Sequence, residues 1–306
     1  MQRFSINWFF YLIIGIFLAV FFITPVLAAS PVKADNYQDF TKWYLKKYDL
    51  EETPWRAAVV IEAETYTPLY YHQESRVMPT ASLIKLVTAG AVVRSPINWW
   101  QRVGFSWADN EGDLRPLVEP RDTFSLLKIK ENDTVTVERA FASMLIGSAN
   151  NAANRFTTFN NNRENFLNKM RQVALTWGML KTTIVEPTGL SLENTSTAAD
   201  MANGVCHALE NFITQFYASK PSYSFTTTLG EEKTVKHTVH KLRADPKRWF
   251  GAKTGYLRET GYHLAAGFIT PEGKRICASI LSTKSRATSE SVLYDMGEWV
   301  DQMYSW

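Results

Sequence analysis

Ser82 and Lys85 stand three residues apart in the stretch "PTASLIKLVTAG", where a turn is expected to run into an apolar helix. A serine hydroxyl is a poor nucleophile without a neighbouring base, and a lysine removed from water becomes neutral enough to act as one. Near a helix N-terminus the two side chains fall on one face, and a backbone N–H can meet a developing negative charge. The same spacing recurs at residues 30–33 and 125–128, so the pair alone is weak evidence.

Two further short motifs strengthen the evidence for a serine nucleophile at Ser82. The stretch "GSAN" supplies Ser148 and Asn150 after an expected helix, and "AKTG" supplies Lys253, Thr254 and Gly255 on an expected strand. The three motifs in this order are the set found in penicillin-recognising serine enzymes.

From about Pro54 to Trp306 the chain resembles the low-molecular-mass penicillin-binding proteins, the serine D-alanyl-D-alanine carboxypeptidase and endopeptidase family of bacterial cell walls. The resemblance extends over "PTASLIKLVTA", "MLIGSANNAA", "VEPTGLSLENTSTAADMA" and "GAKTGY". It implies a serine D,D-peptidase that cleaves peptidoglycan stem peptides through an acyl-enzyme, needs no cofactor or metal, and is inhibited covalently by β-lactam antibiotics.

The resemblance also implies a role for each motif residue. Ser82 is the expected nucleophile and Lys85 its base, while Ser148 passes a proton to the leaving amine and Asn150 holds Lys85 and the substrate amide. The expected substrate-binding residues are Lys253, Thr254, Gly255 and Tyr256. They contact the terminal carboxylate of the substrate, or its equivalent, and the oxyanion. The backbone N–H groups of Ser82 and Tyr256 form the expected oxyanion hole.

Two positions depart from the family pattern, since Asn151 stands where Asp is frequent and Leu257 where Thr commonly follows. Arg258 is expected to be a solvated side chain, the alternative being a positive charge placed near a carboxylate. The two departures motivate an alternative, a catalytically weak scaffold that binds the cell wall. A class A-like β-lactamase is the other alternative, supported by Glu186 but opposed by Leu190, where that class has Asn. The "VEPTGLS" line and the absence of room for a second β domain favour an endopeptidase over a carboxypeptidase.

Strands are expected near both ends of the chain and helices between them. Residues 56–63 and 69–72, and then "GAKTGY", "YHLAAGFIT" and "RICASILST", have strand patterns, whereas the middle carries apolar residues at helical spacing. Thr197 and Asp200 form an expected capping box, and the last helix is expected to cover the sheet. The pattern predicts an α+β fold of the β-lactamase/transpeptidase type, an antiparallel sheet flanked by helices with an inserted helical lobe.

The apolar run that follows Arg3 and ends in small residues predicts an export signal. The expected parts are a signal peptide over residues 1–28, an N-terminal helical segment over 29–53 and the penicillin-binding serine peptidase domain over 54–306. The first segment is either cleaved or retained as a membrane anchor; in both cases the rest of the protein lies in the periplasm or extracytoplasmic cell wall.

The net charge and the cysteine and histidine content give little further indication of function. The formal net charge of +3 gives no indication of nucleic-acid binding. The two cysteines, Cys206 and Cys277, either pair after export or remain buried thiols, and His237 with His240 forms an expected surface pair without a third metal ligand.

Overall fold

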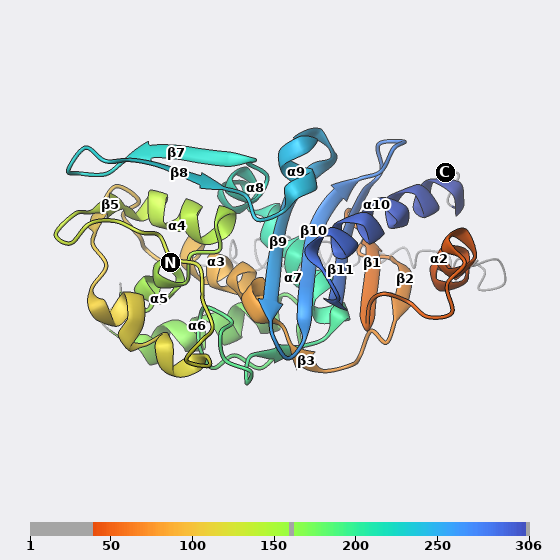
Figure 1. The fold of residues 1–306 in the computed structure, drawn as a ribbon, viewed down its shortest axis with the longest axis horizontal. Coiled ribbons are helices and arrows are strands. Elements are labelled where there is room, and N and C mark those ends of the chain that lie inside the picture. The colour runs from red at the N-terminus through yellow and green to blue at the C-terminus, as the bar shows by residue number, and fades with distance from the viewer. Residues whose placement is uncertain (1–38, 159–161, 304–306) are drawn as a thin grey trace, which may run out of the picture. The chain divides into compact units, whose positions relative to one another are not determined.

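The computed structural model describes residues 39–158 and 162–303, so the expected signal peptide lies outside the described residues. At its centre one antiparallel sheet joins strands from both ends of this range, as expected, in the order β2-β1-β11-β10-β9 (Figure 1). The strands are β1 (Ala57–Glu62), β2 (Pro68–His72), β9 (Trp249–Leu257), β10 (Gly261–Ile269) and β11 (Arg275–Thr283). Strand β9 is an edge strand, and its free edge faces the helical part of the molecule.

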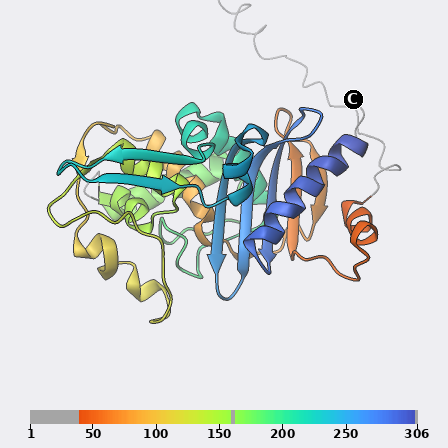
Figure 2. The same cartoon turned by 45° about the horizontal axis from the view of Figure 1, so that its top comes forward.

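Each face of the sheet has its own apolar core, because successive side chains of a strand point to opposite faces. Val59 belongs to one core and Val60 to the other. Over the face that carries Val60 lie α10 (Arg286–Met303) and α2 (Phe40–Tyr48), as Figure 2 shows for α10. The ring of Phe40 lies 5.6 Å from that of Trp299, which ties α2 to α10.

The opposite face packs against α7 (Ala198–Glu210), which belongs to the helical lobe inserted between β2 and β9. The other helices of this lobe are α3 (Lys85–Val93), α4 (Val137–Ile146), α5 (Asn150–Arg155), α6 (Arg163–Thr176) and α8 (Phe212–Ala218). This arrangement confirms the predicted α+β fold with an inserted helical lobe.

The remaining elements are short. A hairpin of β7 (Ser222–Thr226) and β8 (Glu232–Lys236) lies over the lobe, and the sequence pattern did not reveal it because most of its side chains are polar or exposed. The others are β3 (Met78–Pro79), β4 (Arg102–Val103), β5 (Val135–Thr136), β6 (Thr195–Ser196), α9 (His240–Ala244), η2 (Ala81–Ile84), η3 (Ala108–Gly112), η4 (Arg115–Leu117), η5 (Phe156–Thr158) and η6 (Pro246–Arg248).

The expected capping box at α7 is half formed. Thr197 is the N-cap, and its side chain accepts a hydrogen bond from the backbone N–H of Asp200. The carboxylate of Asp200 instead accepts from the backbone N–H of Lys181 and the hydroxyl of Thr182. It therefore fastens the start of α7 to the preceding loop.

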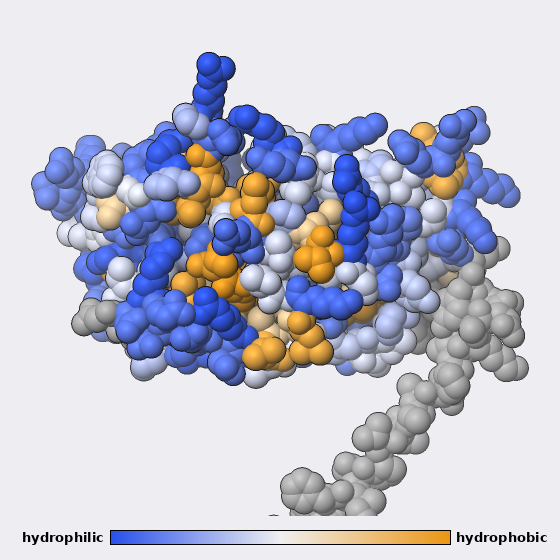
Figure 3. Space-filling model, turned by 90° about the horizontal axis from the view of Figure 1, so that it is seen from below, coloured by the Kyte–Doolittle hydropathy of each residue, from blue (hydrophilic) through white to orange (hydrophobic). Residues whose placement is uncertain are grey.

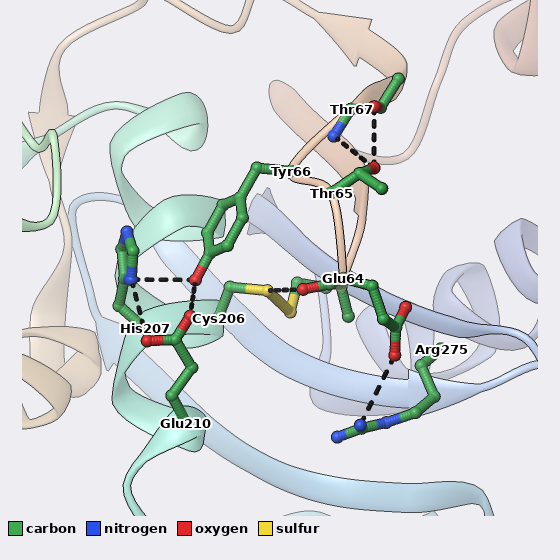
Figure 4. Close-up of a disulfide and its surroundings, with 10 residues drawn as sticks. Glu64, Thr65, Tyr66, Thr67, Cys206, His207, Glu210 and Arg275 are labelled. Carbon is green, nitrogen blue, oxygen red and sulfur yellow. Dashed lines mark hydrogen bonds and ion pairs between the residues drawn. A yellow bond between two sulfur atoms is a disulfide. The ribbon is translucent and has the colours of Figure 1, made fainter. Parts of the chain in front are cut away.

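Cys206 and Cys277 form a disulfide, which decides between the two alternatives that the sequence left open. The bond joins α7 to β11 beneath the sheet, beside the hydrogen-bonded side chains of Tyr66, His207 and Glu210 (Figure 4).

The surface is mostly polar on the face shown in Figure 3, where apolar side chains gather near the middle. Within residues 39–158 and 162–303, no helix has the length and apolar character that crossing a bilayer requires.

Candidate active site

Ser82 lies in the short helical turn η2, which leads directly into α3. The residue before it, Ala81, has a φ of 51°, a left-handed conformation that is uncommon for a residue with a side chain. Such conformations persist only where the surroundings hold them, and they concentrate at functional sites. Ser82 remains partly exposed, whereas the rest of the turn is buried.

Lys85, the first residue of α3, is fully buried and directed at Ser82. Its Nζ lies 2.8 Å from Oγ of Ser82, 2.7 Å from Oδ1 of Asn150 and 2.5 Å from the carbonyl oxygen of Thr188. Burial lowers the pKa of Lys85 to about 7, and the negative charge of Glu186 acts in the opposite direction. Near neutral pH a large fraction of Lys85 is therefore unprotonated and within proton-transfer distance of Ser82.

The carbonyl of Thr188 is held in place by Glu186. The Glu186 carboxylate accepts hydrogen bonds from the backbone N–H and hydroxyl of Thr188, both at 2.6 Å, and from the backbone N–H of Gly189 and the side chain of Asn194. A buried carboxylate with this many donors organises a loop. Glu186 thus anchors the loop that contacts Lys85.

Ser148 and Asn150 follow α4 at a second unusual point of the backbone, because Ser148 has a φ of 60°. The Ser148 hydroxyl accepts a hydrogen bond from Nζ of Lys253 at 2.7 Å. Asn150 begins α5, and both its backbone N–H and its side-chain amide donate to the carbonyl of Ser125. The second motif is therefore linked to Lys85, to Lys253 and to the loop that contains Ser125.

Strand β9 carries the third motif along the edge of the sheet. Lys253 is fully buried, and its pKa is lowered well below the ordinary value by burial and by the nearby charges of Lys85 and Arg286. The hydroxyl of Thr254 donates to that of Thr238 at 2.8 Å. The strand approaches the nucleophile turn closely, since a Cβ at Gly255 would lie 3.2 Å from the backbone nitrogen of Ser82.

Tyr256, in contrast, exposes its ring, which lies 4.5 Å from the ring of Tyr262 on the neighbouring strand. All eight predicted site residues thus lie on the elements around η2 and the edge of the sheet. A chain of hydrogen bonds from Ser82 through Lys85 to Asn150 joins the first motif to the second, and a separate bond between Ser148 and Lys253 joins the second to the third.

The two departures from the family pattern have structural explanations. Asn151 is buried and holds Leu127 with two hydrogen bonds, one through its oxygen and one through its nitrogen, and Leu257 is buried in the sheet. Arg258 is exposed, in keeping with the expected solvated side chain, and its guanidinium also forms an ion pair with the carboxylate of Asp122.

The expectation that both histidines lie on the surface was wrong for His237. His237 is buried and its Nδ1 accepts from the backbone N–H of Val239, whereas His240 is exposed. Burial, together with the charge of Lys253, lowers the pKa of His237 to about 3. Among the described residues no group of His, Cys, Asp and Glu side chains is arranged to hold a metal ion.

Sequence reasoning missed the two backbone carbonyls that orient the site, those of Ser125 and Thr188, together with the hydroxyl of Thr238. A carbonyl group is present in every residue, so the sequence carries no signal for these two. The line "VEPTGLS" did mark the loop of Thr188, although only through the resemblance.

The sequence matches one family model over residues 47–285, described as D-alanyl-D-alanine carboxypeptidase. Among curated proteins, the chain is 25% identical over 258 residues to a D-alanyl-D-alanine endopeptidase of Pseudomonas aeruginosa, covering 82% of this chain and 76% of that protein. It is 28% identical over 212 residues to a D-alanyl-D-alanine endopeptidase of Escherichia coli, covering 68% and 65%.

Solved structures share the fold. The DD-transpeptidase of Streptomyces K15 superposes with a TM-score of 0.72 at 22% identity, covering 82% of this chain and 98% of that one. A D-alanyl-D-alanine carboxypeptidase from Mycobacterium tuberculosis gives a TM-score of 0.72 at 19% identity, covering 83% and 93%.

Proposed function

The chain belongs to the D-alanyl-D-alanine carboxypeptidase family, and on this premise we propose that it is a serine D,D-peptidase which cleaves peptidoglycan stem peptides through an acyl-enzyme on Ser82. One observation carries the proposal: Nζ of the buried Lys85 lies 2.8 Å from Oγ of Ser82, and its pKa is lowered to about 7.

In the acylation step, unprotonated Lys85 takes the hydroxyl proton while Oγ of Ser82 attacks the carbonyl carbon of the scissile D-alanine. The C–N bond then breaks, and the leaving amine gains a proton through Ser148. Water hydrolyses the resulting ester and regenerates the hydroxyl. The contact between Asn150 and Lys85 keeps the lysine aimed at Ser82 throughout.

Lys253 and Thr254 are proposed to bind the carboxylate on the leaving side of the substrate, or the equivalent group of a cross-linked peptide. Lys253 is buried near another lysine, which disfavours its charged form. A substrate carboxylate placed beside Thr254 would favour that charged form again, so binding and protonation support each other. The backbone N–H groups of Ser82 and Tyr256 are proposed to stabilise the oxyanion, at about 3 kcal/mol for each donor.

The geometry around Glu186 does not support the β-lactamase alternative. Its carboxylate is occupied by donors of its own loop, among them the backbone N–H groups of Thr188 and Gly189. A group bound in this way organises the backbone and does not activate a hydrolytic water. The scaffold alternative loses its motivation too, since Asn151 and Leu257 are both buried packing positions.

Between the two D,D-peptidase activities we favour the endopeptidase. Two of the relatives described above carry that name, and the "VEPTGLS" line resembles the same branch. Purified protein incubated with defined cross-linked muropeptide dimers and with pentapeptide monomers, followed by mass spectrometry, tests the choice. Conversion of dimers to monomers supports the endopeptidase, whereas loss of one D-alanine from pentapeptides with intact dimers contradicts it.

We further propose that the protein acts outside the cytoplasm. The disulfide between Cys206 and Cys277 supports this location, because such bonds persist mainly in oxidising compartments. N-terminal sequencing of the mature protein tests cleavage near residue 28.

A fluorescent penicillin provides the direct test of the nucleophile. The wild-type protein should be labelled covalently and Ser82→Ala should not. Ser125→Ala is a matched control, because that serine begins a second Ser-x-x-Lys stretch but contributes only its backbone carbonyl to the site. Undiminished labelling of Ser82→Ala would remove Ser82 from the mechanism.

A further inference from the structure

An ion pair connects the two walls that flank the nucleophile. Arg258 lies in the turn after β9, and its guanidinium pairs with the carboxylate of Asp122, a residue of the loop that precedes β5. The two side chains keep 56% and 28% of their surface exposed, so a molecule in solution can reach both.

The pair lies close to Ser82 along both walls. On one wall, Gly255 of β9 approaches the backbone nitrogen of Ser82, and Arg258 follows three residues later in the turn after the strand, at most about 10 Å from Gly255. On the other wall, Ser125 binds Asn150 through its carbonyl, and Asp122 precedes it by three residues.

Both partners are held by neighbouring groups. Arg115 donates to the backbone carbonyl of Asp122 at 2.9 Å, and its guanidinium lies 4.7 Å from the ring of Phe124. The turn that carries Arg258 ends at Gly261, which has a φ of 77° and lies against the carbonyl of Thr283. The backbone on either side of the ion pair is therefore held in place by neighbouring groups.

We propose that Arg258 is a receptor for a free carboxylate on the acyl-donor peptide, and that Asp122 occupies this receptor when no substrate is bound. The inference rests on the proposed function and names a feature of its substrate. Because Lys253 and Thr254 precede Gly255 on β9 and are assigned to the leaving side, Arg258 beyond Gly255 serves the acyl side. The substrate carries its carboxylate within about three residues of the scissile bond.

The chemistry of the pair suits an exchange. A guanidinium binds carboxylates with directional, charge-assisted hydrogen bonds, so a substrate carboxylate can replace that of Asp122. An exposed ion pair contributes little to folding stability, so opening it costs little. Tyr256 and Tyr262 form an aromatic surface on the same strand pair, against which the peptide can pack.

The test uses two synthetic peptides that end in D-alanyl-D-alanine and differ at one side chain near the acyl donor, a carboxylate in one and a carboxamide in the other. For the wild type we expect kcat/KM to favour the carboxylate peptide about tenfold. Arg258→Gln should reduce the ratio to about one, and Asp122→Asn should raise it severalfold through a lower KM. Glu64→Gln, which removes the carboxylate of the exposed ion pair with Arg275 beside the disulfide (Figure 4), should leave the ratio unchanged.

A wild-type ratio of about one, or an unchanged preference in Arg258→Gln, overturns the inference. A parallel loss of activity on both peptides in Asp122→Asn, without a change in their ratio, assigns the pair a purely structural role and also overturns it. Calorimetry with Ser82→Ala, with and without Arg258→Gln, measures the affinity of both peptides for the proposed receptor in the absence of catalysis. The two proposals can fail separately. If the wild type hydrolyses neither peptide, the proposed function is contradicted. The receptor is still supported if Ser82→Ala binds the carboxylate peptide more tightly than the carboxamide peptide and loses this preference with Arg258→Gln.

Discussion

Gly189 lies against the turn of the nucleophile so closely that a Cβ built on it would overlap the carbonyl oxygen of Ala81 and lie 2.9 Å from the backbone nitrogen of Ser82. Its φ of 81° also belongs to the left-handed region that glycine tolerates best. The loop anchored by Glu186 therefore supports the nucleophile turn from behind through backbone contact.

The first prediction concerns this contact. Gly189→Ala should displace Ser82 and reduce the rate of acylation by fluorescent penicillin at least tenfold, because the backbone of Ala81 must move. Gly230→Ala is the matched control, since Gly230 has a similar φ of 85° but nothing within 4 Å of its added Cβ. It should lose about 1 kcal/mol of folding free energy and acylate normally. Equal acylation rates in the two variants would contradict the supporting role of Gly189.

The second prediction is a pH dependence set by Lys85. Since its pKa is lowered to about 7 and the unprotonated form is the base, the acylation rate should fall about tenfold for each pH unit below that value and level off above it. Stopped-flow measurement with a chromogenic cephalosporin between pH 5 and 9 checks this. Lys85→Arg should be inactive across the range, because arginine stays protonated. A rate that rises as the pH falls would exclude unprotonated Lys85 as the base.

The third prediction separates the two effects of Glu186. Its charge raises the pKa of Lys85, so Glu186→Gln should move the midpoint of the pH profile to lower pH. The variant should also lose about 1 to 3 kcal/mol of folding free energy, because an amide cannot accept from all the donors of Thr188, Gly189 and Asn194. Thermal unfolding and the same pH series measure both. A stable variant whose only defect is slow release of bound penicillin would instead favour the β-lactamase mechanism.

The fourth prediction concerns the disulfide. Cys206→Ala combined with Cys277→Ala should lower the unfolding free energy by about 2 to 4 kcal/mol, since the bond closes a loop between residues separated by 71 positions. Acylation at 25 °C should be unchanged, because the bond joins α7 to β11 and neither element carries one of the eight site residues. A reducing phosphine should lower the melting temperature of the wild type and leave that of the double variant unchanged. A melting temperature of the double variant equal to that of the wild type would contradict a stabilising role.

The sequence predicted those parts of the fold whose burial follows a regular period. The three strands of the C-terminal part are apolar over most of their length, and the helices of the lobe repeat apolar residues every three or four positions. The hairpin of β7 and β8 was missed although Tyr223 and Phe225 alternate with polar residues, because the alternation is short and Phe225 is its single buried side chain. Strands of two residues, such as β3, are too short for any periodic signal.

The candidate site, like the fold, has features that the sequence predicted and others that it did not. Side chains with distinctive chemistry, such as Ser82, Lys85 and Lys253, stand in recognisable motifs, and the structure brings these motifs together through hydrogen bonds. The ion pair between Asp122 and Arg258 joins residues 136 positions apart, and neither lies in a motif. The fit between Gly189 and Ala81 depends on backbone conformation, which single residue types do not specify.

The order of the strands has a consequence for folding. Strand β1 pairs with β11 along its whole length. The backbone groups on that side of β1 therefore have no strand partner until β11, the last strand of the sheet in the sequence, has formed. Contacts between such distant segments slow folding, because much chain entropy is lost before they form. During that interval the apolar stretch from Ala57 to Glu62 presents an unpaired strand edge, which is a template for aggregation. We therefore expect refolding from denaturant to be slow and its yield to fall with protein concentration, with the pairing of β1 and β11 as a late event.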